Sequence, residues 1–378
     1  MTNWEKDLKA LLKNQSVEDR AQLETMLNSM LEQESPNQFI QLLGNPTVDA
    51  LKQLCREHHI KGYSALKKDE IATLLITSIV TQSYFNEVIN QMNEDQQRLF
   101  LHILAMNQNG ESIETDISFP ESFLIFETER DERGYHLLWI PEEIIAQVEK
   151  WVTQHETLKQ FKLEQDVIEA TTNLYGLYSL SQLQHVMNKY LEKTYSLLEI
   201  RKLLRRFTRL MPHTRNFIVG EGYITSVGLE LEPDEYHHFL KDAKYYEPAT
   251  LNDLLYYQTH VFGLDDETYF NFVSWLSKNI REDNKLNATV DGLTVEILTM
   301  MKHAIEYNMV ADVMYSLVQD GILRKRVEQT AVNKVKPVYM KMRNWIYHGH
   351  TFEEYMHIID REERNKHSNV IDFNDIKQ

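Results

Sequence analysis

Cysteine is almost absent from this chain of 378 residues, since Cys55 is the only one. A single thiol excludes an internal disulfide framework and any zinc site built from several thiolates. The natural compartment for such a chain is a reducing one, and we therefore expect a cytoplasmic protein. Cys55 shares the inner face of a predicted helix with Leu51 and Leu54, which indicates a small core residue and not a nucleophile.

Glycine and proline are also scarce, with 12 and 8 residues respectively. Long stretches are rich in Leu, Glu, Lys, Gln and Met, which lose little side-chain freedom in a helix, so helix should dominate. The longest apolar stretch, residues 71–80, is interrupted by Thr and Ser and is too short to cross a bilayer. The first residues lack the apolar core of a signal peptide. We expect neither secretion nor a membrane partner.

The familiar signatures of catalysis are missing too. The sequence has no phosphate-binding loop of the type GxxxxGKS/T, no GxGxxG after a strand, no GxSxG elbow and no HExxH zinc helix. We therefore predict a protein that is not an enzyme and that needs no cofactor.

Fifteen histidines raise the question of a metal site, and His348 with His350 is the densest candidate, aided by Glu353, Glu354 or His357. A zinc site needs three or four ligands that converge on one point, and the spacing shows two. The pattern His-Gly-His favours the end of a helix, where His and Gly terminate the last turn. We therefore predict no metal.

The charge is strongly negative, −17 at pH 7, while hydrophobic residues make up 42% of the chain and aromatic residues 10%. This apolar content predicts a folded chain, and its length allows two to four domains. The overall negative charge disfavours nonspecific attraction to nucleic acid, so any such contact must come from a local basic patch.

Apolar residues at three- and four-residue spacings predict a helical hairpin in residues 1–34. In residues 47–80, Val48, Leu51 and Leu54 indicate one amphipathic helix and residues 67–79 a second. Residues 59–63 should form a tight connection, with Gly62 as the left-handed residue at the helix end.

The segment 47–80 resembles the N-terminal helical module of the Rho transcription terminator and the related SAP motif. The matching residues are Leu51 and Leu54, residues 60–64 (Ile-Lys-Gly-Tyr-Ser) and residues 66–71 (Leu-Lys-Lys-Asp-Glu-Ile). The resemblance implies a helix-extended-helix unit of the kind attached to nucleic-acid-binding proteins. It also implies contacts to the nucleic-acid backbone from Lys61, Lys67 and Lys68. The alternative is a helical spacer whose lysines are merely solvated.

Two further segments combine helices with a hairpin. Residues 83–150 contain a predicted helix at 83–107, two strands at 123–128 and 135–140 around a charged turn, and another helix from Pro141. Residues 165–232 contain predicted helices at 167–175, 181–190 and 196–210, followed by two strands within 217–227. Three helices and a hairpin indicate a winged-helix-like unit, and we predict one in each segment.

The third helix of the second unit carries the strongest basic patch, and no acidic residue lies between positions 201 and 215. In helix-turn-helix geometry the last helix enters the major groove, where arginines reach guanine edges or phosphates. Alternatively, these cations pair with the surrounding acids. The candidate residues are Arg201, Lys202, Arg205, Arg206, Arg209 and Arg215.

Residues 245–360 should form a C-terminal helical domain, with helices at 251–258, 265–279, 293–308 and 311–323, and residues 361–378 a polar tail. Residues 297–354 resemble the helical region upstream of SEC-C zinc motifs in bacterial proteins. The resemblance is carried by paired helices and by the Asn-Trp, Gly-His-Thr and acidic ending at 344–354. No cysteine follows Gly349, so zinc binding of that type does not carry over.

These features favour a cytoplasmic bacterial protein that is an accessory or regulatory factor associated with nucleic acid. In this hypothesis both basic modules contact DNA or RNA, and the C-terminal helices hold a protein partner. The alternative is a protein-interaction scaffold that binds no nucleic acid. A third hypothesis is a metal-dependent enzyme that uses His348 and His350.

Overall fold

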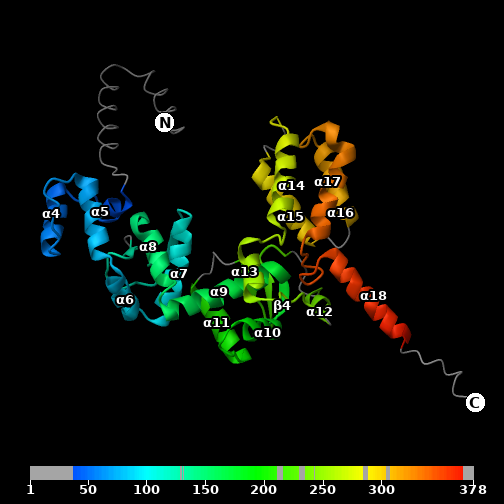
Figure 1. Ribbon diagram of the computed structural model, residues 1–378, viewed down its shortest axis with the longest axis horizontal. Coiled ribbons are helices and arrows are strands. Elements are labelled where there is room, and N and C mark those ends of the chain that lie inside the picture. Colours follow the sequence, from blue (N-terminus) through cyan, green and yellow to red (C-terminus); the bar gives the residue numbers. More distant parts are fainter. Residues whose placement is uncertain are drawn as a thin grey trace, which may run out of the picture. The chain divides into compact units, whose positions relative to one another are not determined.

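The computed structural model describes residues 37–127, 130, 132–210, 216–229, 235–241, 243–283, 288–303 and 307–368 (Figure 1). The chain divides into two compact units, Met1–Lys162 and Leu163–Gln378. The predicted fold class is confirmed in its main feature, because helices dominate and the strands form small antiparallel sheets. The predicted hairpin at 1–34 and the end of the predicted tail lie outside the described residues. None of the described helices combines the length and apolar character needed to cross a membrane.

From residue 37 onward, where its description begins, the first unit contains six helices, a three-stranded antiparallel sheet of order β1-β3-β2, and the beginning of α9. Threonine or asparagine caps several of the helices: Thr47, Thr81 and Asn93 each accept a hydrogen bond from a backbone N–H in the first turn. The elements are α3 (Gln38–Leu42), α4 (Val48–Glu57), α5 (Lys68–Ile79), α6 (Gln82–Gln91), α7 (Glu94–Gln108), β1 (Ile113–Thr115), β2 (Phe126–Glu127), β3 (His136–Trp139), α8 (Glu142–Val152) and α9 (Glu156–Tyr175).

The helix predicted at 83–107 is two helices, α6 and α7. They separate at Asn93, whose side chain accepts from the Gln96 N–H while the Gln96 side chain accepts from the Asn93 N–H. This reciprocal capping box starts a new helix, so local side-chain chemistry overrides the continuous apolar pattern.

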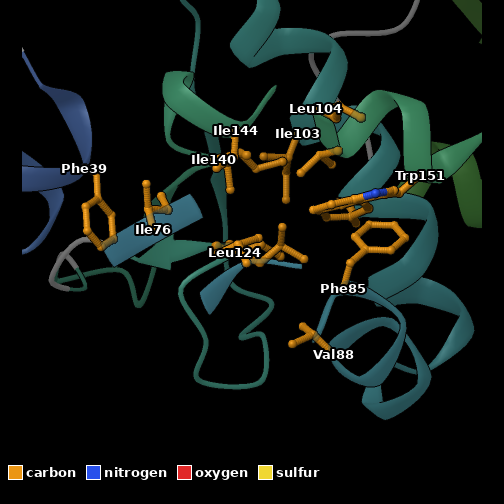
Figure 2. Packing of buried hydrophobic residues seen from close by; sticks show 14 of the residues in the cluster. Phe39, Ile76, Phe85, Val88, Ile103, Leu104, Leu124, Ile140, Ile144 and Trp151 are labelled. Carbon is orange, nitrogen blue, oxygen red and sulfur yellow. The ribbon is translucent and has the colours of Figure 1, made fainter. Parts of the chain in front are cut away.

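The core of this unit gathers side chains from α3 to α8 and from the sheet (Figure 2). Phe85 of α6 packs against Trp151 of α8, with ring centroids 5.6 Å apart. Cys55 is fully buried with Leu51, as predicted, and burial raises the pKa of its thiol. A buried thiol that resists ionisation is a packing group and a poor nucleophile.

The connection between α4 and α5 differs from the prediction at one residue. The left-handed residue that ends α4 is His59, with φ of 56°, and not Gly62. The N–H of Ile60 donates to the Cys55 carbonyl at 2.8 Å and that of His59 to the Arg56 carbonyl at 3.1 Å, which together make a Schellman motif. Gly62 also has a positive φ, 88°, but it lies farther along the connection.

The hairpin predicted in residues 123–140 is confirmed, in a shorter form. Phe126 pairs with Trp139 and Glu127 with Leu138, while residues 123–125 form no strand. The Ser122 hydroxyl accepts from the N–H groups of Leu124 and Ile125, which holds this segment in a turn. Strand β1, which pairs with the other edge of β3, was not predicted.

The second unit begins with helices and strands in the order α9, β4, α10, α11, β5, β6, and its sheet has the order β4-β6-β5. The predicted hairpin at 217–227 is confirmed as β5 and β6. Strand β4 was not predicted, because three residues after a glycine carry no periodic signal. The elements are β4 (Leu177–Ser179), α10 (Leu180–Tyr190), α11 (Leu197–Leu210), β5 (Phe217–Val219) and β6 (Tyr223–Ser226).

The rest of the second unit is helical. Within it α14, α15, α16 and α17 pack around one apolar core that includes Leu276, Leu298, Met314 and Val335 (Figure 1). The predicted helices from residue 251 to 323 are found with shifted ends. The elements are α12 (Glu235–Leu240), α13 (Leu251–Thr259), α14 (Asp266–Asn279), α15 (Val290–His303), α16 (Tyr307–Gln319), the 3₁₀ turn η1 (Lys325–Val327), α17 (Glu328–Lys341) and α18 (Phe352–Ser368).

The His348-Gly349 pair does not end a helix, contrary to the prediction. Helix α17 ends at Lys341, and the pair lies in the loop before α18, with φ of 52° and 83°. Thr351 and Glu354 then cap α18 reciprocally. A Cβ at Gly349 would come within 2.9 Å of the Tyr175 ring, so close packing against α9 fixes this loop.

Candidate nucleic-acid interface

The lysines of the first unit lie at the start of α5 and in the connection before it. Lys61 and Lys67 are exposed, and Lys68 is half-buried. The N–H of Lys67 donates to the Glu70 carboxylate at 2.7 Å, so an acid sits beside these lysines. Asp69 adds a second acid in the first turn, where the helix dipole favours negative charge. These two acids therefore reduce the positive electrostatic potential around the three lysines.

The predicted basic patch of the second unit follows one face of α11. Arg201, Lys202, Arg205 and Arg209 are exposed, and Arg206 is half-buried. We call the four exposed residues the α11 basic face. The opposite face is buried and holds α11 against its unit through Ile200, Leu203, Leu204, Phe207 and Leu210. Arg215 lies outside the described residues.

The spacing brings three of the arginines into one row. Arg201, Arg205 and Arg209 are four residues apart, and side chains at this spacing lie one above the other along a helix. Arg201 and Arg205 form no ion pair with any residue that the structure describes. Acids elsewhere in the described chain therefore leave these two charges unneutralised, although the chain as a whole is acidic.

Glu199 is the one acid within α11, and it is engaged at the helix start. The N–H and hydroxyl of Ser196 both donate to its carboxylate at 2.8 Å, and these bonds lower its pKa. Its charge thus stabilises the first turn. Close by, Lys189 donates to Glu247 at 2.7 Å, so its charge is paired. Neither of these acids is paired with Arg201 or Arg205.

Sequence reasoning missed a cluster around the last turn of α9. Lys302 of α15 is 1% exposed, and its ammonium donates to the Asn173 carbonyl at 2.6 Å. The indole N–H of Trp345 donates to the same oxygen at 2.9 Å. Burial lowers the pKa of Lys302 to about 7. The sequence contains one signal that could have revealed the buried lysine: Lys302 follows Leu298 by four residues and so lies at a core position of an amphipathic helix.

The residues that carry the SEC-C-type resemblance form a packing cluster. The Asn344 side chain donates to the Met301 carbonyl at 2.7 Å, and the Arg343 guanidinium contacts the Glu354 carboxylate at 2.6 Å. Burial opposes the charge of Glu354, but hydrogen bonds from His350, Arg343 and Thr351 outweigh it and lower the pKa to about 2. These groups fasten the 342–351 loop in place.

His348 and His350 do not form a metal site with Glu354, although His350 lies 3.7 Å from its carboxylate. In the described parts of the chain, no group of three His, Cys, Asp or Glu side chains is arranged to hold a metal ion. Burial lowers the pKa of His348 to about 4, and its ring packs against Phe239 and Tyr245. The neutral imidazole acts here as an aromatic packing group.

The two basic groups thus differ in their acidic neighbours: Asp69 and Glu70 both lie in the first turn of α5 beside its lysines, whereas Glu199 is the one acid of α11. This geometry is the basis for a functional assignment. No protein-family model, no curated protein and no solved structure matches this chain.

Proposed function

We propose that this chain is a cytoplasmic, non-enzymatic accessory or regulatory protein that binds nucleic acid through the α11 basic face. The observation that carries the proposal is the exposed, unpaired state of Arg201 and Arg205 on a chain of charge −17. Phosphate contacts from Lys and Arg release condensed counterions, and this supplies most of the free energy of nonspecific binding.

The element order of the second unit supports this role. A helix, a short strand, two helices and a two-stranded hairpin, with sheet order β4-β6-β5, is the arrangement expected of a winged helix. In such a unit α11 is the third helix, which enters the major groove in helix-turn-helix proteins. In the first unit all three strands follow α7, so the winged-helix proposal rests on the second unit.

The α4–α5 pair is proposed as a weaker second contact. Its two helices agree with the two helices of the unit that the Rho-type resemblance implies, and the connection between them contains turns at His59 and Gly62. Lys61, Lys67 and Lys68 would face phosphate there. Asp69 and Glu70 beside them reduce the attraction, so this module should add less affinity than α11.

The test is fluorescence polarisation with random duplex DNA, single-stranded DNA and RNA at low and moderate salt. We expect Arg201→Glu/Arg205→Glu to weaken binding and to reduce the slope of log affinity against log salt by about 2. Lys278→Glu/Lys334→Glu is the matched control, because both lysines are exposed and the change in charge is the same. Equal loss in both variants would reduce the effect to net charge and remove α11 from the proposal.

A protein scaffold is the second candidate, and exposed apolar residues favour it. Leu198 at the start of α11 is 61% exposed, and Phe270 of α14 in the C-terminal helices is 64% exposed. Side chains of this size in contact with water are typical of protein-binding surfaces when they gather in a patch. Absence of binding to every nucleic-acid probe at low salt would make this function the leading one.

A further inference from the structure

A cavity of about 460 Å³ opens in the second unit beside the cluster around Asn173. Its walls come from the end of α9, from the base of the β5–β6 hairpin, from α13 with the turn after it, and from α15 and Trp345. This volume lies within the range of small-molecule sites in proteins. Amide side chains of Asn173, Asn216 and Gln258 and the rings of Phe262 and Trp345 line it, so the surface is mixed polar and apolar.

Lys302 reaches this cavity with hydrogen-bonding capacity to spare. An ammonium has three N–H donors, and in the described part of the chain the Asn173 carbonyl is the one acceptor that Lys302 contacts. No carboxylate there lies within ion-pair distance. Glu169 also lines the cavity, but its carboxylate accepts from Gln165 at 2.9 Å and from Gln258 at 3.3 Å. The lysine is buried without a counter-ion.

Asn216 adds an unsatisfied acceptor to the same cavity. Its side-chain N–H donates to the Asn173 side-chain oxygen at 2.8 Å, while its own side-chain oxygen is buried and has no partner. A buried polar atom without a hydrogen bond is destabilising, and an incoming donor would remove this cost. In this cavity the Lys302 ammonium therefore has room for an anionic or neutral acceptor, and the Asn216 side-chain oxygen has room for a donor.

The rim of the cavity is apolar and in contact with water. Val227, Val261 and Val295 border it, and they are 59%, 40% and 54% exposed respectively. Three exposed valines around one opening favour a ligand with an apolar body. Polar groups inside and apolar groups outside together define an amphipathic occupant.

We propose that this cavity binds a small organic carboxylate that carries a hydroxyl or amino group and an apolar body. The carboxylate accepts from the Lys302 ammonium, the hydroxyl or amino group donates to the Asn216 side-chain oxygen, and the apolar body contacts the valine rim. No covalent step is involved. The site stands independently of nucleic-acid binding, because none of its groups belongs to the α11 basic face.

A purely structural role for Lys302 is the competing explanation. The Asn173 carbonyl belongs to the last turn of α9, and a cation there satisfies an unpaired carbonyl and favours the helix dipole. Such a cap needs one hydrogen bond, which the Trp345 indole already makes. It requires neither a cavity nor a second unsatisfied group at Asn216. The two explanations predict different ligand binding.

Isothermal titration calorimetry of the full chain separates them. The probes are lactate, phenyllactate, salicylate and phenylalanine, each beside its neutral amide, at pH 8 in buffers of different ionisation enthalpy. We expect at least one acid to bind about tenfold or more tightly than its amide. Binding should take up protons, because the carboxylate restores the charged form of a lysine whose pKa burial has lowered. Equal binding of acid and amide, or no binding by any acid, would overturn the proposal.

Two variants and a control locate the site. Lys302→Met should abolish acid binding and its proton uptake, whereas Lys278→Met, at an exposed lysine of the same unit, should change neither. Asn216→Ala should weaken salicylate but leave benzoate, which lacks the hydroxyl, unchanged. This second variant keeps the test decisive if Lys302→Met fails to fold. Salicylate binding that is unaltered by Asn216→Ala would contradict the assigned acceptor.

Discussion

The α11 basic face and Lys302, which contacts the last turn of α9, belong to the same unit, but they lie in opposite environments. Arg201 and Arg205 are exposed and unpaired among the described residues, whereas Lys302 is 1% exposed. An exposed cation keeps its hydration, and its charge is available to a polyanion. A buried cation loses hydration, which disfavours its charged form. Solvent access therefore separates the basic residues of this unit into those that can bind a polyanion and those that serve inside the fold.

Charge reversal on α11 should change nucleic-acid affinity more than the other substitutions do. A small change would contradict the idea that the charges of Arg201 and Arg205 are available to a polyanion. Arg201→Glu/Arg205→Glu removes two phosphate contacts and adds repulsion, so we expect affinity for duplex or single-stranded probes to fall by about 100-fold at low salt. Fluorescence polarisation measures it. Circular dichroism should show unchanged helix content, because neither side chain is buried.

Replacing Lys302 with an uncharged residue tests whether burial disfavours its charged form. We expect Lys302→Met to stabilise the protein by about 1–3 kcal/mol at pH 7, since an apolar side chain avoids the cost of burying a charge. The folded pKa is about 7 and the ordinary value 10.5, so the penalty is full below pH 7 and fades as pH rises toward 10.5. Urea unfolding at several pH values measures the difference. A variant that is less stable at every pH would identify Lys302 as a structural cap.

The comparison between buried and exposed cations can also be made between two ion pairs, Arg343–Glu354 and Arg281–Asp283. The Arg343 side chain is 14% exposed, whereas Arg281, paired with Asp283, is 44% exposed. Arg343→Met should cost about 1–2 kcal/mol, a value reduced because Glu354 is partly solvated. Arg281→Met should leave the midpoint of urea unfolding unchanged. Equal effects would mean that burial does not decide the strength of these pairs.

Acid pH gives a related check on Glu354. Its folded pKa of about 2 lies below the ordinary 4.5, so its carboxylate contributes stability above pH 4.5 that is lost as pH falls toward 2. In Arg343→Met this loss should be smaller, because one of the bonds that lower the pKa is gone. Thermal unfolding from pH 5 to pH 2.5 compares the two proteins.

The smallest expected effect concerns the lysines of the first unit. Lys67→Glu/Lys68→Glu should weaken nucleic-acid binding by about threefold, because Asp69 and Glu70 already reduce the local positive field. The same polarisation assay measures it beside the α11 variant. A loss larger than that of Arg201→Glu/Arg205→Glu would reverse the order of the two modules.

Much of the local structure could be predicted from the sequence, because its causes lie within a few residues. Apolar spacing located α4, α5, α10 and α11, and apolar segments on either side of a charged or glycine-containing turn located both hairpins. The row Arg201, Arg205, Arg209 follows from helix periodicity as soon as α11 is recognised. Errors arose where a short-range device interrupts a long pattern, as Asn93 does between α6 and α7.

The sequence by itself determined that this protein is mainly helical, has small hairpins and carries a basic helix on an acidic chain, because composition and periodicity act locally. Only the tertiary structure decided which cations are buried. Lys302 and Asn173 are 129 residues apart in the chain, and no local pattern records their contact. His348 likewise became a packing group because Phe239 and Tyr245 surround it. Burial and hydrogen bonding between distant segments set the charge state of such groups, and sequence spacing does not specify them.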